Sequence, residues 1–153
     1  MAVYKVRWNK FHPRTFISAS ADWTVKIWDS KINTPILSLD LGMPVVDVMF
    51  APYSSTVFAC AILEKVFVYD LHIDKHSKLA EIKPVKQPKL TNLSFNCYEP
   101  TILVGDDHGG ATLLKLSPNL TKGGVVPKEH EELSPNDYEK LKMENLINVA
   151  GKF

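Results

Sequence analysis

Asp106, Asp107 and His108 are three adjacent residues whose side chains could bind a metal ion or transfer protons. Carboxylates and imidazoles are common ligands of divalent metals, and they are also the usual general acids and bases. The three residues, however, stand between two runs of apolar residues and are followed by Gly109-Gly110, a context typical of a hairpin turn. We therefore interpret the cluster as a turn, and we predict neither a catalytic residue nor a metal ligand in it.

The other nucleophilic and metal-binding residue types lack the spacing that chemistry requires. Cys60 and Cys97 are far apart and form no CxxC motif, so we expect a reducing compartment and neither a disulfide framework nor a zinc site. His72 and His76 lie four residues apart, but in a charged stretch without a helix to align them. The sequence has no phosphate-binding loop, nucleophile elbow or HExxH motif. It therefore predicts a protein that is not an enzyme and that uses no metal or cofactor.

The charge balance also argues against two classes of partner. The 153 residues include 18 Lys and Arg against 17 Asp and Glu, which leaves a net charge of +1. This balance provides no general attraction to nucleic acids or to anionic membranes. No apolar run approaches the roughly 18 residues of a membrane-spanning segment, and the first residues lack the apolar core of a signal peptide. We therefore expect protein partners, and neither nucleic acid nor membrane.

The elements that carry these residues form an internal repeat. Three segments can be aligned, and each opens with alternating apolar residues that end in an aromatic one, Trp8, Phe50 or Phe95. Such alternation is typical of strands with one buried face. The aromatic residues are 42 and 45 positions apart, which is the period of propeller blades built from several short strands. The aligned segments are residues 3–29, 44–70 and 89–116.

The repeat predicts an all-β fold of about three propeller blades, followed by a linker and a short α-helix. The third repeat lacks a fourth strand, and three blades form an arc, whereas closed rings of this kind usually have about seven. Because an open arc exposes strand edges, we expect the chain to be the C-terminal part of a larger subunit or to lie beside one, and the alternative is a truncated gene product. The expected boundaries are 1–118 for the incomplete propeller (blades at about 3–40, 41–83 and 89–116), 119–133 for the linker and 134–150 for the helix. The expected strands are 3–8, 15–20, 24–28, 35–40, 44–50, 56–62, 65–70, 78–83, 90–95, 101–105 and 111–116.

The predicted C-terminal helix has start and stop signals of its own. Ser134 can cap it, Pro135 suits its first position, Asp137 completes a capping box, and Gly151 is a plausible stop. A helix of this length is marginal in water unless its apolar face packs on something. The expected apolar face consists of Tyr138, Met143, Leu146, Ile147, Val149 and Ala150.

The stretch SADWTVKIWD, residues 20–29, resembles the closing half of a WD repeat, in which Trp28-Asp29 is the dipeptide itself. Tyr69-Asp70 takes the equivalent place in the second repeat. The resemblance implies WD40-type blades in which Asp22 is the acceptor of a tight turn. Taken together and in order, SADWTVKIWD, APYSSTVFA, VGDDHGG and LKLSPNL are similar to the C-terminal blades of dynein intermediate chains, most of all the axonemal outer-arm type.

The family resemblance implies a non-catalytic scaffold subunit of an axonemal outer-arm dynein, located in the cytoplasm and cytoskeleton, in the axoneme of a cilium or flagellum. Propellers of this family bind the tail of a dynein heavy chain, and the resemblance also implies other intermediate and light chains as partners. It further implies that the missing blades come from the parent subunit or from a neighbouring chain. The N-terminal extension that binds light chains in the family has no counterpart in these residues. The alternatives are a cytoplasmic dynein intermediate chain and a generic WD40 adaptor that binds peptides.

Several aromatic residues could serve either the fold or a partner. Trp23 directly follows the turn residue Asp22, and we expect it either to anchor a partner or to pack on a neighbouring blade. Tyr53 lies in a loop and is expected either to contact a partner or to stabilise the loop itself. The recurrence of aromatic residues in register predicts core packing for Trp8, Trp28, Phe50 and Phe95. The residues expected to hold the blades together are Trp8, Asp22, Trp28, Asp29, Phe50, Tyr69, Asp70 and Phe95.

Overall fold

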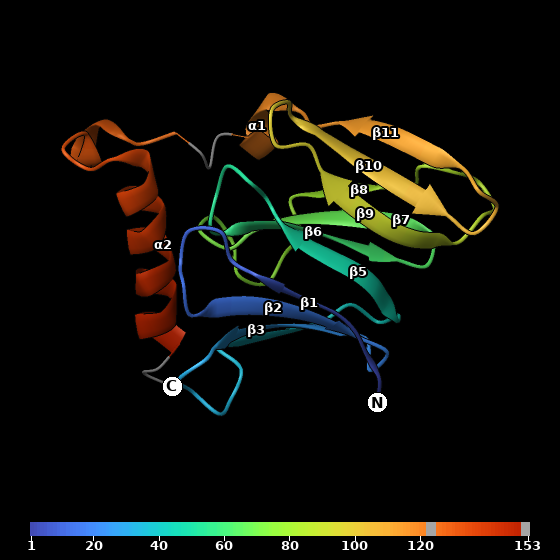
Figure 1. Ribbon diagram of the computed structural model, residues 1–153, viewed down its shortest axis with the longest axis horizontal. Coiled ribbons are helices and arrows are strands. Elements are labelled where there is room, and N and C mark those ends of the chain that lie inside the picture. Colours follow the sequence, from blue (N-terminus) through green and yellow to red (C-terminus); the bar gives the residue numbers. More distant parts are fainter. Residues whose placement is uncertain (122–124, 151–153) are drawn as a thin grey trace.

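The computed structural model describes residues 1–121 and 125–150, and it shows three antiparallel sheets side by side with one long helix along their edge (Figure 1). We call the sheets blades 1, 2 and 3, in chain order. Blade 1 contains β1 (Val3–Trp8), β2 (Thr15–Ser20), β3 (Thr24–Asp29) and β4 (Leu37–Asp40). Blade 2 contains β5 (Val45–Phe50), β6 (Val57–Ile62), β7 (Lys65–Asp70) and β8 (Ala80–Ile82), and blade 3 contains β9 (Leu90–Phe95), β10 (Thr101–Asp106) and β11 (Ala111–Lys115). The helical elements are α1 (Pro118–Thr121), η2 (Lys128–His130) and α2 (Pro135–Ala150).

The predicted all-β architecture is confirmed. Each of the eleven strands lies within two residues of its predicted ends, because period-2 alternation and turn residues define these short strands locally. Within the described residues, blade 3 has three strands, and no fourth strand pairs with β11. The predicted linker contains the end of α1 and the single turn η2. None of the described helices is both long and apolar enough to cross a membrane.

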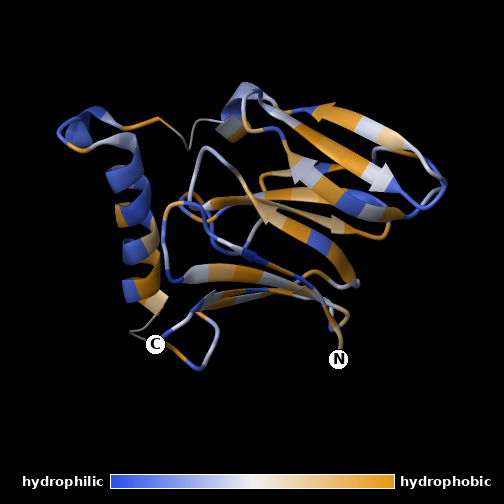
Figure 2. Ribbon diagram, in the orientation of Figure 1, coloured by the Kyte–Doolittle hydropathy of each residue, from blue (hydrophilic) through white to orange (hydrophobic). Residues whose placement is uncertain are grey.

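The blades pack face to face through two rows of side chains that recur in register. On the side that faces the preceding blade, the paired positions across three strands are Phe50, Phe58 and Tyr69 in blade 2. This row belongs to one buried cluster with Ile17 and Ile27, which lie on the opposite side of blade 1. We call these two sides of a blade its backward face and its forward face. Figure 2 shows that apolar residues are especially dense in blade 2, the blade covered on both faces.

The same contact recurs one blade further on. The forward face of blade 2 presents Ala59 and Val68. These residues share a second buried cluster with Phe95 and Ile102 on the backward face of blade 3. One type of interface, a forward face against a backward face, therefore builds both contacts between blades.

The prediction that Trp8 packs in the core is wrong, because its side chain is 65% exposed. Trp8 lies on the backward face of blade 1, and nothing in the described part of the chain covers this face. Trp28 lies on the same face and is half-buried, so the prediction for it holds only in part. Phe50 and Phe95, at equivalent positions on covered faces, are each 5% exposed, and the prediction for them is confirmed.

Asp47 joins the inner strands of all three blades. It stands at an irregularity in the register of β5 and is fully buried. Its Oδ2 accepts a hydrogen bond from the backbone N–H of Leu93 in blade 3 (2.9 Å), and its Oδ1 accepts one from its neighbour Val48 (2.8 Å). From blade 1, the Arg7 guanidinium lies 3.9 Å from Oδ1 and donates from Nε to the Val48 carbonyl (3.1 Å). Because a buried carboxylate is costly unless it is compensated in this way, Asp47 holds the three strands at one spacing.

We predict that Asp47→Ala lowers the free energy of unfolding by about 2–4 kcal/mol, because it leaves the buried N–H of Leu93 without an acceptor and removes the partner of Arg7. Urea unfolding followed by tryptophan fluorescence measures this change. Asp40→Ala is the matched control, since Asp40 is exposed and accepts a bond from Gly42 in its own loop. An equal loss of stability in both variants would contradict the role of Asp47.

Helix α2 docks against the edge of blades 1 and 2 (Figure 1). Ser134 caps it as predicted: the Ser134 hydroxyl accepts a hydrogen bond from the Asp137 N–H (3.2 Å). Met143 and Leu146 enter the cluster shared by blades 1 and 2, whereas Val149 is 42% exposed, so the expected apolar face is wrong at this residue. The predicted stop, Gly151, lies outside the described residues.

The docked face of α2 also buries two charged residues, which the sequence analysis did not anticipate. Glu139 and Lys142 are 2% and 4% exposed, and Lys142 Nζ lies 2.8 Å from Glu139 Oε1. Glu139 Oε2 accepts hydrogen bonds from the Ser55 N–H (2.7 Å) and the Ser54 hydroxyl (3.3 Å). The Ser55 hydroxyl donates in turn to the Glu139 carbonyl (2.7 Å), and Asn9 Nδ2 donates to the Ser55 carbonyl (2.9 Å). This network fixes the helix to the β5–β6 loop and, through Asn9, to blade 1.

We expect Lys142→Met to lower the free energy of unfolding by about 3 kcal/mol, since it removes the ammonium that compensates the buried Glu139 carboxylate. Adding Glu139→Gln should restore more than half of the loss, because the amide oxygen still accepts from Ser55 and carries no charge. Chemical unfolding of the two variants and of an exposed neighbour, Lys140→Met, measures the effect. If the double variant were as unstable as Lys142→Met, charge compensation would not be what holds the helix.

Candidate interaction surfaces

The acidic cluster beside β11 is a hairpin turn, as the sequence analysis predicted. Asp106 Oδ1 accepts hydrogen bonds from the backbone N–H groups of His108 (2.9 Å) and Gly110 (2.8 Å). Asp107 Oδ1 accepts one from the Lys89 N–H (3.0 Å) and lies 3.0 Å from His108 Nδ1. Ligand-type atoms of Asp106, Asp107 and His108 come within 4.8 Å of one another, but their bonds shape the turn between β10 and β11.

The two thiols differ sharply in their surroundings. Cys60 is fully buried in β6, and burial raises the pKa of its thiol to about 12. It therefore stays protonated at physiological pH and cannot act as a thiolate nucleophile or ligand there. Cys97 is exposed in the β9–β10 loop and forms no disulfide with Cys60.

The aspartates assigned to the blades organise turns. Asp22 Oδ1 accepts hydrogen bonds from the backbone N–H of Thr24 (3.0 Å) and from its hydroxyl, and Lys26 pairs with Oδ2 (3.2 Å). These hydrogen bonds, the Thr24 hydroxyl first, hold the pKa of Asp22 well below its ordinary value. The predicted role of Asp22 as a turn acceptor is thus confirmed. Asp29 and Asp70 each accept from the N–H two residues ahead, at 2.9 and 3.0 Å.

Trp23, at the tip of this turn, combines backbone strain with exposure. It has a positive φ of 73°, the only such value at a described residue other than glycine. A left-handed backbone costs a residue with a side chain about 1–2 kcal/mol, and it is uncommon for bulky residues. The indole is nevertheless 49% exposed, so packing offsets only part of this cost. Strain at an exposed aromatic residue favours the partner-anchor interpretation, which stays a prediction.

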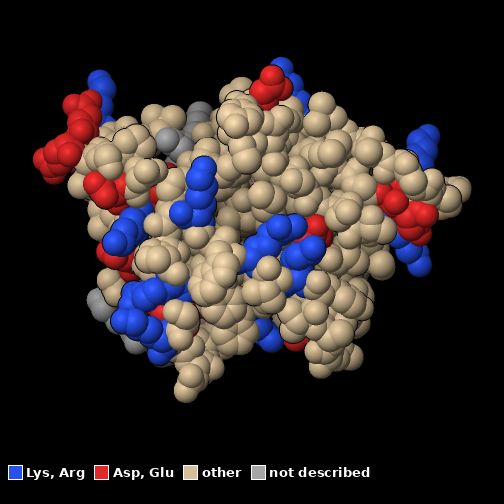
Figure 3. All heavy atoms as spheres, in the orientation of Figure 1, with Lys and Arg blue, Asp and Glu red and all other residues tan. Residues whose placement is uncertain are grey.

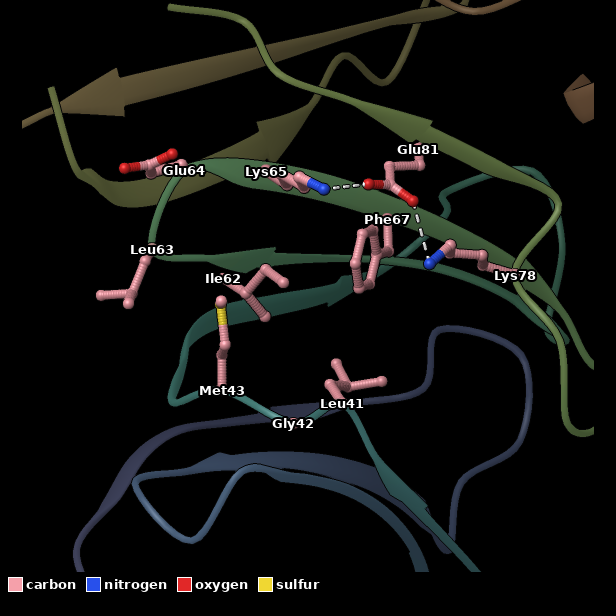
Figure 4. A pocket seen from close by; sticks show the side chains of 10 residues that line it. All are labelled: Leu41, Gly42, Met43, Ile62, Leu63, Glu64, Lys65, Phe67, Lys78 and Glu81. Atoms are coloured by element: carbon pink, nitrogen blue, oxygen red, sulfur yellow. Dashed lines mark hydrogen bonds and ion pairs between the residues drawn. The ribbon is translucent and has the colours of Figure 1, made fainter. Parts of the chain in front are cut away.

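A groove lies between blades 1 and 2, at the end of the blades away from α2 (Figures 1 and 4). The Trp23 carbonyl accepts a hydrogen bond from the Leu41 N–H (2.9 Å), and Leu41 leads into the groove. The volume of the groove is about 400 Å³. Figure 4 shows Leu41, Met43, Ile62 and Phe67 around an apolar floor, with Lys78 above the Phe67 ring, 4.1 Å from its centroid.

The rim of this groove carries both signs of charge. Glu81 pairs with Lys65 and with Lys78, and Lys83 pairs with Glu64 beside them. On the face of the molecule seen in Figure 3, basic and acidic side chains are likewise interspersed. The groove therefore suits an apolar side chain flanked by polar groups better than a strongly charged ligand.

Tyr53 makes its contacts inside the chain. Its hydroxyl donates to the Leu120 carbonyl in α1 (2.8 Å), and its ring packs edge-on against Phe95, 6.3 Å between centroids. Burial raises the pKa of Tyr53 well above its ordinary value. These contacts tie the β5–β6 loop to α1 and leave Tyr53 poorly placed to anchor a partner.

The chain shows clear sequence similarity to known proteins, although no family model matches it. It is 50% identical to the ciliary dynein intermediate chain 2 of Heliocidaris crassispina, over 98% of this chain. It is 46% identical to dynein axonemal intermediate chain 1 of Bos taurus, also over 98% of this chain. By sequence, the chain is similar over nearly its whole length to one region of the axonemal dynein intermediate chains.

A further similar protein comes from Chlamydomonas reinhardtii. Its 78 kDa intermediate chain of the flagellar outer arm is 37% identical over 99% of this chain. The chain spans about a fifth of the length of these curated relatives, 22% in each of the three. The names of these three relatives describe them as ciliary, axonemal and of the flagellar outer arm.

Solved structures identify the fold as WD40-type. The C-terminal WD40 domain of Sif2 superposes on 76% of this chain with a TM-score of 0.63 and 21% identity, and the chain covers 34% of it. A chain of the mitotic checkpoint complex matches 75% of this chain with a TM-score of 0.64 and 15% identity, and 36% of that chain is covered. At these identities the likeness concerns the fold alone.

The groove between blades 1 and 2 could not be predicted from the sequence. Leu41 and Met43 are apolar residues in a loop, which is a weak signal when taken alone. Phe67, Lys78 and Glu81 come from strands and a loop of the next blade, and only packing brings them to the same place. A search for apolar residues in loops between strands would have suggested Met43.

We predict that Trp23→Gly leaves the free energy of unfolding unchanged or raises it by up to about 1 kcal/mol, because glycine adopts the left-handed conformation without strain. Trp23→Ala keeps the strain and loses the packing, so it should be the less stable of the two. Thermal unfolding of both variants measures the difference. A large loss of stability in Trp23→Gly would show that the indole serves mainly the fold.

Proposed function

We propose that this chain is a non-catalytic scaffold region of an axonemal outer-arm dynein, which binds the heavy-chain tail and helps to assemble and dock the arm for ciliary motility. The observation that carries the proposal is the 50% and 46% identity to ciliary and axonemal intermediate chains over nearly the whole chain. The chemistry of the described residues supports it, because the one metal-type cluster forms a turn and the thiol of Cys60 is buried and protonated.

In this proposal, the heavy-chain tail contacts the end of blades 1 and 2 that carries Trp23. Trp23 and Met43 are both about half exposed, at 49% and 47%. Met43 lines the groove floored by Phe67, and the Trp23 carbonyl accepts a hydrogen bond from Leu41, which lines it as well. An amphipathic helix fits such a surface, since one large side chain can enter the groove while its polar face meets the mixed charges of the rim. Exposed aromatic residues in a rigid frame are the usual anchors of such contacts.

The rigidity of the chain is what makes it a scaffold in this proposal. Asp47 ties the inner strands of three blades together, and the Glu139–Lys142 pair fixes α2 across blades 1 and 2. A partner that binds the groove edge would therefore be held in a defined orientation to other dynein intermediate and light chains bound elsewhere. Further blades, from a longer subunit or a neighbouring chain, would cover the two free blade faces.

Expression of the tagged chain in ciliated cells tests the proposal. We expect the chain in isolated axonemes, and a dynein heavy chain should co-purify with it after extraction in high salt. Trp23→Gly should reduce heavy-chain recovery at least about tenfold, the effect of losing one anchor residue. Tyr98→Ser is the matched control, since Tyr98 is 97% exposed but lies in the β9–β10 loop, away from the groove.

Two results would contradict the proposal. One is a chain found in axonemes without any heavy chain, which would remove the heavy-chain contact. The other is a chain confined to the cytosol, which would favour a cytoplasmic dynein subunit or a general adaptor. Equal recovery with the wild type and Trp23→Gly would place the contact away from the groove edge.

A further inference from the structure

The groove between blades 1 and 2 carries an unbalanced charge at its rim. Lys65 and Lys78 both pair with the single carboxylate of Glu81, as the dashed lines in Figure 4 show. We call these three residues the rim triad. We propose that the segment which enters this groove carries an acidic residue close to a large apolar one, so that its carboxylate meets the rim triad. The inference rests on the proposed function, because it describes the chemistry of the heavy-chain segment that binds there.

The rim triad has one positive charge in excess. Lys65 Nζ contacts one oxygen of Glu81, and Lys78 Nζ lies 2.9 Å from the other, so a single carboxylate serves two ammonium groups. The hydrogen bonds from Lys65 and Lys78 hold the pKa of Glu81 below its ordinary value, so its carboxylate is ionised at physiological pH. Beside the triad, Lys83 and Glu64 form a pair that balances itself, with Nζ and Oε2 at 2.6 Å. The triad is therefore the part of the rim that can accept a further carboxylate.

The excess charge lies directly beside the apolar floor of the groove. Lys78 Nζ is 4.1 Å from the centroid of the Phe67 ring, and Met43 and Ile62 line the same groove. A partner's apolar side chain that packs on this floor therefore comes close to the Lys78 ammonium and removes water from it. Loss of water is costly for a charged group unless an opposite charge compensates it. Because Glu81 is already shared by two ammonium groups, the compensating carboxylate has to come from the partner.

The short distance between the ammonium and the floor also determines where the carboxylate lies in the partner. On an α-helix, side chains three or four positions apart are neighbours, with Cβ atoms about 5–6 Å apart. An acidic residue at this spacing can reach Lys78 while the apolar side chain contacts Phe67. A basic residue there would add to the positive charge of the triad, and a wholly apolar segment would leave that charge uncompensated. The rim therefore selects a segment that is both acidic and apolar.

Neutral substitutions within the rim triad test the sign of the partner's charge. Lys78→Gln leaves the triad neutral, and Glu81→Gln leaves it with two positive charges. Both side chains are partly exposed, at 39% and 33%, so neither change disturbs a packed core, and thermal unfolding checks that each variant is folded. The readout is the heavy chain recovered with the tagged chain from an axonemal extract at physiological salt.

The two variants should differ in direction. Lys78→Gln should reduce heavy-chain recovery at least about fivefold, because the partner's carboxylate loses its surplus cation. Glu81→Gln should recover as much heavy chain as the wild type or more, since the positive charge that faces the partner increases. Lys31→Gln is the matched control and should equal the wild type, because Lys31 is an exposed lysine in the β3–β4 loop, at the other end of blade 1.

Three outcomes would overturn the inference alone. A loss of recovery in Glu81→Gln but not in Lys78→Gln would mean that the partner segment is basic. Equal losses in both variants would mean that the triad only holds the rim in shape. No change in either variant, together with a loss in Trp23→Gly, would leave the groove as the contact but remove the acidic residue from its partner. If the wild-type chain recovered no heavy chain at all, the proposed function would fail first, and the inference with it.

Discussion

The packing of one sheet face on another is the interaction on which this structure depends. Each blade is a small antiparallel sheet with apolar residues on both faces, and covering these faces is what stabilises it in water. Blade 2 meets this condition within the chain, and its backward row of Phe50, Phe58 and Tyr69 is almost fully buried. Blades 1 and 3 each have one face covered. The exposed Trp8 and Leu113 are the direct result, and they define where other β-sheets can bind.

Buried polar groups set how the blades and the helix are aligned. Hydrophobic burial is not directional, so alone it would allow the sheets to slide on one another. Asp47 prevents sliding of the inner strands, since its carboxylate requires the Leu93 N–H at a fixed distance. Glu139 likewise fixes the position of α2, because its carboxylate contacts the N–H of Ser55 and the ammonium of Lys142. These contacts make the arc a rigid frame.

The contacts around the β2–β3 turn explain how Trp23 keeps a strained backbone conformation. A left-handed conformation persists at a tryptophan only because the turn around it is determined by Asp22 and by the pairing of β2 with β3. The turn also holds the Trp23 carbonyl at 2.9 Å from the N–H of Leu41, a residue that lines the groove with Phe67. The similarity to axonemal dynein intermediate chains agrees with the proposal of a molecule that presents fixed edges to partners.

The sequence by itself determined the eleven strands, the three repeats and the cap of α2, because these depend on local alternation, on turn residues and on a side chain that bonds three residues ahead. It also identified Asp22 as a turn acceptor. The tertiary structure alone decided which aromatic residues are buried: Trp8 and Phe50 look alike in sequence, but only Phe50 has a blade before it. It likewise decided that Glu139 and Lys142 face inward, since their compensation comes from Ser54 and Ser55, more than 80 residues away in the chain. Local patterns specify a strand or a turn, but burial depends on which neighbour covers a face, and that is a property of the packed molecule.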